Sequence, residues 1–188
     1  MPANLKTIEA SAFKECTALT TLYFSNGLTT IADKAFQSCT NLALTALPDS
    51  VTTIGANAFQ SCTNLALTAL PDSLTSIGGT AFSDCTNLTL TSLPDSVTSI
   101  DNYAFQRCTN LSLTTMPANL RSIGVSSFLM CTNLTSVTFK GKPNLIGSSA
   151  FASCTSLLTI NVPWAEGAVA NAPWGATNAT INYNYTGE

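Results

Sequence analysis

One pattern recurs every 23 residues along almost the whole chain, and this period restricts the fold more than any other feature of the sequence. Phe-x-x-Cys occurs seven times in unbroken register and accounts for all 7 cysteines. An isoleucine lies five residues before each of these Phe residues, and a leucine lies three residues after each Cys. A fixed period of this length is typical of stacked supersecondary units. The columns run from Ile8 to Ile146, Phe13 to Phe151, Cys16 to Cys154 and Leu19 to Leu157.

Each unit contains a turn, a short β-prone segment, a segment with helical spacing and a strand. In the third unit, residues 48–50 (Pro-Asp-Ser) have turn chemistry, and residues 51–54 are β-prone. Ala58, Phe59 and Cys62 lie at i, i+1 and i+4, which predicts a helical turn with one apolar face. One unit cannot bury this face alone, so neighbouring units must share a continuous core.

We therefore predict an α/β solenoid of seven coils over residues 1–162, with a parallel sheet on one side and short helices on the other. The period ends after Pro163. Residues 163–188 contain both tryptophans and two tyrosines, and we interpret them as a cap whose aromatic side chains cover the last coil. These aromatic residues are Trp164, Trp174, Tyr183 and Tyr185.

The composition argues against several classes of function. Only 9% of the residues are charged, against about a quarter in a typical soluble domain, so Thr, Ser, Asn and Ala must cover the surface. A net charge of −3 and 7 scattered Lys and Arg residues argue against a nucleic-acid partner. No apolar run is long enough to span a membrane. The sequence has no His and no nucleophile or phosphate-loop motif, so we expect no enzyme activity and no cofactor.

The repeated unit resembles the BspA-type leucine-rich repeat. The resemblance rests on Leu-Pro-Asp-Ser-Val-Thr-Ser-Ile followed by Ala-Phe-x-x-Cys-Thr-Asn-Leu, and it covers residues 1–162. It implies a right-handed leucine-rich-repeat superhelix and a bacterial cell-surface or secreted protein that binds host matrix proteins or other cells. Such repeats also occur in prophage-encoded structural proteins. The motif contains no binding residues, so it identifies no site.

Two columns of residues could suggest metal or redox chemistry. The cysteines lack the paired spacing and the histidines of a zinc site, and their odd number cannot pair fully as disulfides. We predict a ladder of buried free thiols instead. Asp49, Asp72 and Asp95 align on successive turns, where calcium is one interpretation. Each Asp follows a Pro in a turn, which favours a turn role and no metal.

A further leucine column occurs only in the middle units and has two alternative placements. If all strands share one pleat, these leucines form an exposed stripe that marks a partner site. If the strand changes parity at a bulge, the leucines enter the core and the neighbouring threonines face outward. Burial is worth roughly 1.5–3 kcal/mol per leucine and favours the second arrangement. The column is Leu44, Leu67, Leu90 and Leu113.

The first functional hypothesis is a surface-exposed adhesion or ligand-binding module that recognises a protein or glycan through its sheet face. The candidate contacts are Tyr23, the four leucines and the four aromatic residues of the tail. The alternative is a structural spacer or a phage-tail-like appendage component. Residues 1–5 repeat residues 116–120, so we interpret the chain as a fragment of a longer protein whose signal peptide lies elsewhere. We expect a monomer or weak self-association through an end coil.

Overall fold

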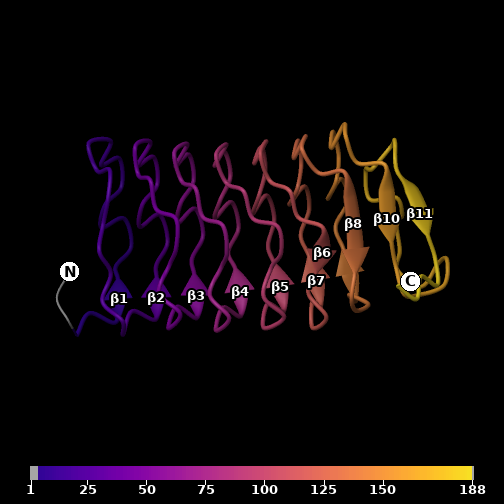
Figure 1. Cartoon of the computed structure of the whole chain (residues 1–188), viewed down its shortest axis with the longest axis horizontal. Helices are drawn as coiled ribbons and strands as arrows, with labels where there is room; N and C mark the ends of the chain where they lie inside the picture. Colours follow the sequence, from indigo (N-terminus) through magenta and orange to yellow (C-terminus); the bar gives the residue numbers. More distant parts are fainter. Residues whose placement is uncertain (1–3, 188) are drawn as a thin grey trace.

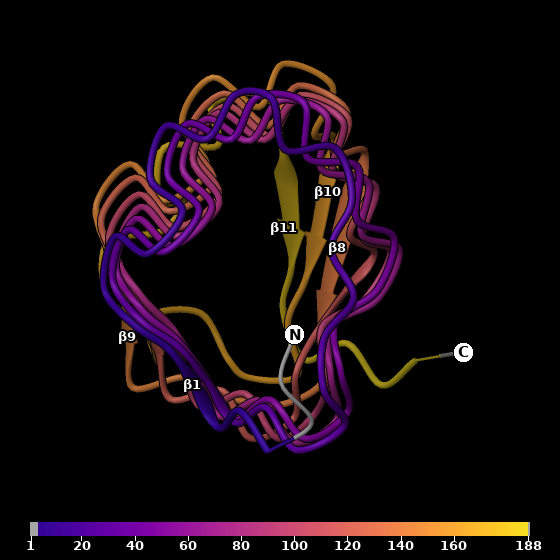
Figure 2. The ribbon, with the colours of Figure 1, turned by 90° about the vertical axis from the view of Figure 1, so that its left-hand side faces the viewer.

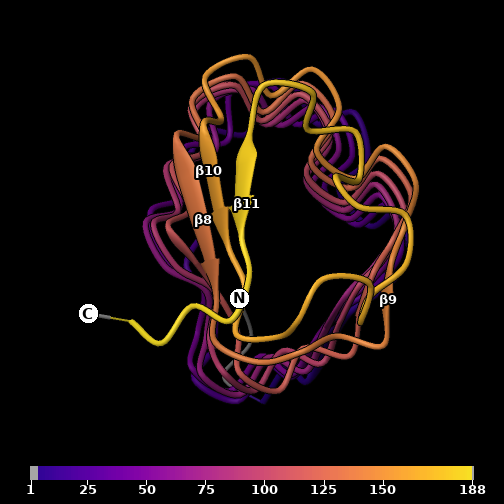
Figure 3. The same cartoon turned by 90° about the vertical axis from the view of Figure 1, so that its right-hand side faces the viewer.

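The computed structural model describes residues 4–187, which form a β-solenoid of about eight turns. Figure 1 shows the turns side by side along the long axis, in chain order. Figures 2 and 3, seen from the two ends, show that successive turns follow nearly the same outline. In the part of the chain that the structure describes, no helix is long and apolar enough to cross a membrane.

Within residues 4–187, eleven short strands form two parallel sheets. The first, which we call the isoleucine sheet, has the order β1-β2-β3-β4-β5-β7-β9, and the second, the C-terminal sheet, has the order β11-β10-β8-β6. Most are two residues long: β1 (Thr7–Ile8), β2 (Thr30–Ile31), β3 (Thr53–Ile54), β4 (Ser76–Ile77), β5 (Ser99–Ile100), β6 (Thr115–Met116), β7 (Ser122–Ile123) and β9 (Leu145–Ile146). The longer ones are β8 (Ser136–Phe139), β10 (Thr159–Asn161) and β11 (Thr180–Asn182).

The isoleucine sheet follows directly from the repeat. Its strands pair in the 23-residue register, so that Ile31 pairs with Ile54 and Ile54 with Ile77. The isoleucine side chains of the sheet are buried, and the residue before each of them is more exposed. Alternation along a strand therefore separates core from surface, as its two-residue period requires.

The predicted short helices are wrong: the structure contains no helix among residues 4–187. In the third unit the segment forms successive turns, with Asn57 and Ser61 in the left-handed region at φ 57° and 58°. Its N–H groups alternate in direction. Those of Asn57, Phe59 and Ser61 donate to carbonyls of the next coil, and those of Ala58, Gln60 and Cys62 donate within their own turns. A helix would direct every N–H back to its own chain, so bonding between coils excludes it.

Two ladders fill the centre of the solenoid. The seven Phe rings of the repeat stack with centroids 5.2–5.5 Å apart and planes within 9° of parallel. Six buried thiols each donate to the carbonyl of the Phe in the preceding coil, as Cys62 does to Phe36 at 3.0 Å. The prediction of free, buried thiols is confirmed for Cys39 through Cys154, whereas Cys16 is exposed.

A glycine column forms the corner after the isoleucine sheet. A Cβ atom on Gly78 would lie 2.6 Å from the carbonyl carbon of Gly55, and one on Gly147 would lie 2.5 Å from that of Gly124. Real Cβ atoms do not approach backbone this closely, so these corners need glycine for the close approach of successive coils.

After residue 162 the chain makes an eighth, irregular turn. Val169 and Trp174 lie 23 residues after Ile146 and Phe151, and both are buried. Further on, Thr159 of β10 pairs with Thr180 of β11, a step of 21 residues, so this turn is two residues shorter. The tail thus extends the solenoid beyond the seven predicted coils, and it covers the last of them with Trp174.

Candidate binding surface

One wall of the solenoid carries no charge. The second to sixth units each have a segment free of Asp, Glu, Lys and Arg that begins at the cysteine, and these segments are residues 39–48, 62–71, 85–94, 108–120 and 131–139. Backbone hydrogen bonds join them laterally: Ala66 N–H donates to Leu44, and Ser112 N–H donates to Leu90. The neutral segments therefore lie next to one another on the same wall.

We call the outward side chains of this region the neutral wall. In the middle coils it contains four exposed threonines, and in the later coils it continues as the outer face of the C-terminal sheet. Its residues are Thr45, Thr68, Thr91, Thr114, Ser136, Thr138, Thr159, Asn161, Thr180 and Asn182.

A change of parity inside each unit explains why threonines face outward. In the second unit the buried positions are Leu42, Leu44 and Leu47, with steps of two and then three residues. In the sixth unit they are Leu134, Val137 and Phe139, with steps of three and then two. Every unit thus contains one three-residue step between buried positions. The position of this step in the unit decides which residue faces the core.

The structure places the four leucines of the middle units in the core. Leu44, Leu67, Leu90 and Leu113 are 7%, 0%, 0% and 1% exposed, so the favoured burial is confirmed and no exposed stripe forms. Their prediction as binding residues is wrong, because a ligand on the surface cannot contact buried side chains. Burying four leucines outweighs the small cost of moving the bulge.

Hydrogen bonds order the C-terminal part of the neutral wall. Asn161 donates from Nδ2 to the Thr138 hydroxyl at 3.0 Å, and Asn182 donates from Nδ2 to Asn161 Oδ1 at 2.8 Å. These bonds limit the rotamers of the amides before any ligand arrives. In the middle coils β-branched threonines, which have few χ1 options, have a similar effect.

The aromatic candidates fall into two groups. Trp164 and Trp174 are 6% and 1% exposed and pack on Phe139, with ring centroids 5.3 and 6.4 Å away. They belong to the core of the last turn, which corrects their prediction as surface contacts. Tyr23 is 85% exposed in the first coil, and Tyr183 and Tyr185 are half-buried near the other end. These three tyrosines remain candidate contacts.

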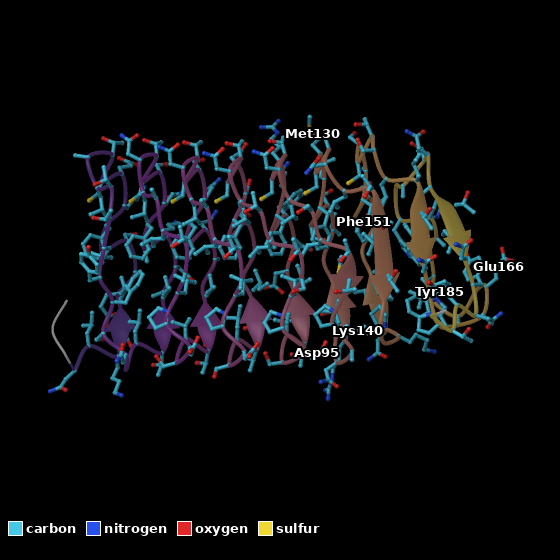
Figure 4. All side chains as sticks on the ribbon, viewed as in Figure 1. Asp95, Met130, Lys140, Phe151, Glu166 and Tyr185 are labelled. Carbon is cyan, nitrogen blue, oxygen red and sulfur yellow. The ribbon has the colours of Figure 1, made fainter. Side chains whose placement is uncertain are left out.

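Asp95 is a charged side chain that serves local structure between coils. Asp95 Oδ1 accepts from Ala118 N–H at 3.1 Å and from Lys140 Nζ at 3.2 Å, and both contacts lower the pKa of this carboxyl group. Figure 4 shows Asp95 and Lys140 at one edge of the coils and Met130 at the opposite edge. Among the described residues, no three His, Cys, Asp or Glu side chains come together as metal ligands.

A shallow depression that sequence reasoning missed lies beside the isoleucine sheet. Its volume is about 380 Å³, and its lining includes Asp101, Asn102, Ser122, Gly124 and Leu145. Asn102 Oδ1 accepts the N–H of the exposed Val125 at 2.7 Å. The sequence carried no signal for this depression, because its lining comes from the corners of neighbouring coils.

Comparisons with known proteins agree with this architecture. The profile of a family described as "BspA type Leucine rich repeat region (6 copies)" matches residues 1–69 and 66–169. A solved leucine-rich repeat protein of T. pallidum is 29% identical, with a TM-score of 0.61, and the match covers 88% of this chain and 73% of that protein. A leucine-rich cell surface protein of Faecalibacterium prausnitzii A2-165 is 26% identical, with a TM-score of 0.64. That match covers 84% of this chain and about half, 52%, of the other protein. No curated protein matches the chain significantly.

Proposed function

Because the chain belongs to the BspA-type leucine-rich repeat family, we propose that it is a non-enzymatic module, displayed at or released from a bacterial cell surface, that binds a protein or glycan through the neutral wall. The observation that carries this proposal is the wall itself: the exposed threonines, continued by serine, threonine and asparagine, extend over most of the solenoid without a charge. The solved relative from F. prausnitzii is titled a cell surface protein, which supports the location.

The chemistry of the wall suits a neutral, polar partner. A threonine offers a hydroxyl that donates and accepts hydrogen bonds and a methyl group that makes apolar contacts. Its desolvation costs much less than that of a charged side chain. The underlying leucines and the bonds between coils hold the backbone in place, so binding loses little conformational entropy. Sugar hydroxyls and uncharged protein surfaces both match these groups.

The same chemistry argues against a polyanionic partner. Nucleic acids and strongly acidic polymers are held largely by Lys and Arg, whose charge releases condensed counterions. The neutral wall has no such residue, and the whole chain has a net charge of −3.

The test is a binding screen of the chain against host matrix proteins and a neutral glycan array, with a matched pair of charge substitutions. Thr68→Lys places a cation in the middle of the neutral wall, and Thr53→Lys places the same cation on the exposed face of the isoleucine sheet. A ligand held by the wall should lose at least about tenfold in affinity with Thr68→Lys. It should change less than about twofold with Thr53→Lys.

Equal effects of the two substitutions, or no captured ligand in the whole screen, would contradict the proposal. Circular dichroism and urea unfolding of both variants provide the control for folding. Both threonines are exposed, so each substitution should change the stability by less than about 0.5 kcal/mol.

A second candidate function, a rigid spacer or appendage component, is supported by the continuous core. The Phe stack runs from Phe13 to Phe151 without interruption, which makes the body stiff along its axis. A spacer depends on length, so deleting one complete 23-residue unit should alter its function even where Thr68→Lys has no effect. A binding wall should show the opposite dependence.

A further inference from the structure

The residues at the N-terminal end of the solenoid are less buried than the equivalent residues of the later coils. Cys16 is exposed although Cys39 through Cys154 are all buried, and Phe13 is only partly buried although the six later Phe residues of the same column are fully buried. Leu5, Leu19, Leu22 and Phe24 are likewise only partly buried. The first coil thus presents an apolar end made of the same residue columns that form the core elsewhere.

This end also has backbone groups without partners. In later coils the N–H at the corner after the isoleucine donates to the preceding coil, as Gly55 does to Ile31 at 2.9 Å and Gly78 to Ile54 at 3.0 Å. The corresponding N–H in the first coil, that of Glu9, has no backbone partner among the described residues. Within residues 4–187 this donor therefore has no backbone acceptor at the corner.

Three open acceptors lie along the neighbouring turns. In the fourth coil, the carbonyls of Gly79, Ala81 and Ser83 accept from the third coil at 2.8–2.9 Å. Their equivalents in the first coil are the carbonyls of Ala10, Ala12 and Lys14. None of these three accepts a backbone hydrogen bond from the described part of the chain.

We infer that the N-terminal end face is a docking surface for one more 23-residue coil of the same repeat, arriving with its C-terminal side in parallel register. Such a coil presents the carbonyl of its isoleucine, as Ile31 does to the next coil, and three forward N–H groups, as Lys34, Phe36 and Ser38 do. It would meet the open donor and the three open acceptors, and its Phe ring would cover Phe13. The internal contacts between coils show the same complementarity at every step.

A second copy of the chain fits this face poorly. An approach with the same end would bring carbonyls toward carbonyls. Nor does the opposite end supply the required donors, because its N–H groups point into their own turns: Trp174 donates to Asn171 and Ala176 to Pro173, both at 2.9 Å. Pro173 has no N–H at all. At these positions the C-terminal end therefore does not offer the donors that the N-terminal end needs.

The chain itself provides a well-defined test. Residues 1–5 are identical to residues 116–120, so a copy of residues 93–115 placed before Met1 reproduces a natural junction. The control graft has the same length but carries serine in place of the copies of Ile100 and Phe105, so that it cannot pack as a coil. The measurement is the rate at which N-ethylmaleimide modifies each thiol of the native protein under reducing conditions, resolved by peptide mass.

In the ungrafted chain, Cys16 should react much faster than the six buried thiols. The intact graft should slow Cys16 at least about tenfold, toward the rate of Cys39, and should show a new fast thiol in the copy of Cys108. The control graft should leave Cys16 unchanged. Amide hydrogen exchange should show new protection of Glu9 with the intact graft only.

Several outcomes would overturn the inference. They are an unchanged rate at Cys16, equal protection by both grafts, or loss of folding in the intact graft, which would expose all the thiols despite the natural junction. A concentration-dependent dimer of the ungrafted chain that protects Cys16 would show that a second copy is the occupant instead. The test does not involve the neutral wall, so its result is independent of the proposed ligand binding.

Discussion

The two ends of the solenoid carry equivalent residues in very different surroundings. At the N-terminal end, Phe13 is partly buried and Cys16 is exposed, and at the C-terminal end, Phe151 is fully buried and Cys154 is 5% exposed. The difference comes from the eighth turn, whose Trp174 continues the Phe column. Each coil of this molecule therefore depends on its neighbours for burial, as expected when stability is the sum of coil and interface terms.

The largest expected effect concerns the thiols that the coils bury. Burial raises the pKa of Cys62 and Cys154 to about 12, and it raises the pKa values of Cys85, Cys108 and Cys131 well above the ordinary value of 9.0. Above pH 9 the unfolded chain releases protons that the folded chain keeps, so stability is lost as the pH rises. Each thiol contributes about 1.4 kcal/mol per pH unit. We expect a loss on the order of 10 kcal/mol by about pH 10.5, enough to unfold a typical domain.

Urea unfolding followed by circular dichroism between pH 8 and 10 measures this slope, and variants at the end and in the middle of the column compare the two environments. Cys16→Ala removes the exposed thiol of the column and serves as the matched control. Cys85→Ala should reduce it by about 1.4 kcal/mol per pH unit, apart from any constant loss of stability. Equal slopes in both variants would show that the buried column does not differ from the exposed end.

The next effect compares aromatic residues of one column at the two ends. Trp174→Ala should destabilise the chain by about 3–5 kcal/mol, because it removes a buried ring and opens a cavity beside Phe139. Phe13→Ala should cost only about 1 kcal/mol, since its side chain is partly exposed. Urea unfolding at neutral pH gives both values, and Trp174→Ala should also make Cys154 react with maleimide nearly as fast as Cys16. Similar costs for the two substitutions would remove the distinction between a closed and an open end.

The smallest expected effect compares a surface ion pair with the buried contacts between coils. Lys140→Ala removes the ion pair with Asp95, which links side chains 45 residues apart on the exposed surface. The loss should be about 0.2–1 kcal/mol and should shrink in high salt. A thermal unfolding scan at low and high ionic strength is sufficient. A larger, salt-independent loss would mean that surface pairs hold the coils together as strongly as the core does.

The period alone predicted the solenoid, its parallel register and most of its core. Ile54, Phe59, Cys62 and Leu65 recur at fixed spacing, and an apolar column repeated in this way is buried as soon as identical coils stack. The absence of charge on one wall could also be read from the sequence, because each neutral segment is continuous in the chain. The choice between leucine and threonine in the middle units followed from transfer free energies.

Other features depended on which neighbour each backbone group met. Ala58, Phe59 and Cys62 have helical spacing, but the N–H of Phe59 bonds to the next coil, and no pattern within one unit reveals that partner. The aromatic tail was predicted as a cap, but the place of Trp174 in the Phe column was missed because the eighth turn keeps the column and not the sequence of the repeat. The exposure of Cys16 depends on the coil beside it rather than on its motif. The spacing of side chains can be read within one stretch of sequence. Hydrogen bonds between coils, and the burial of one coil by the next, exist only after the coils are stacked.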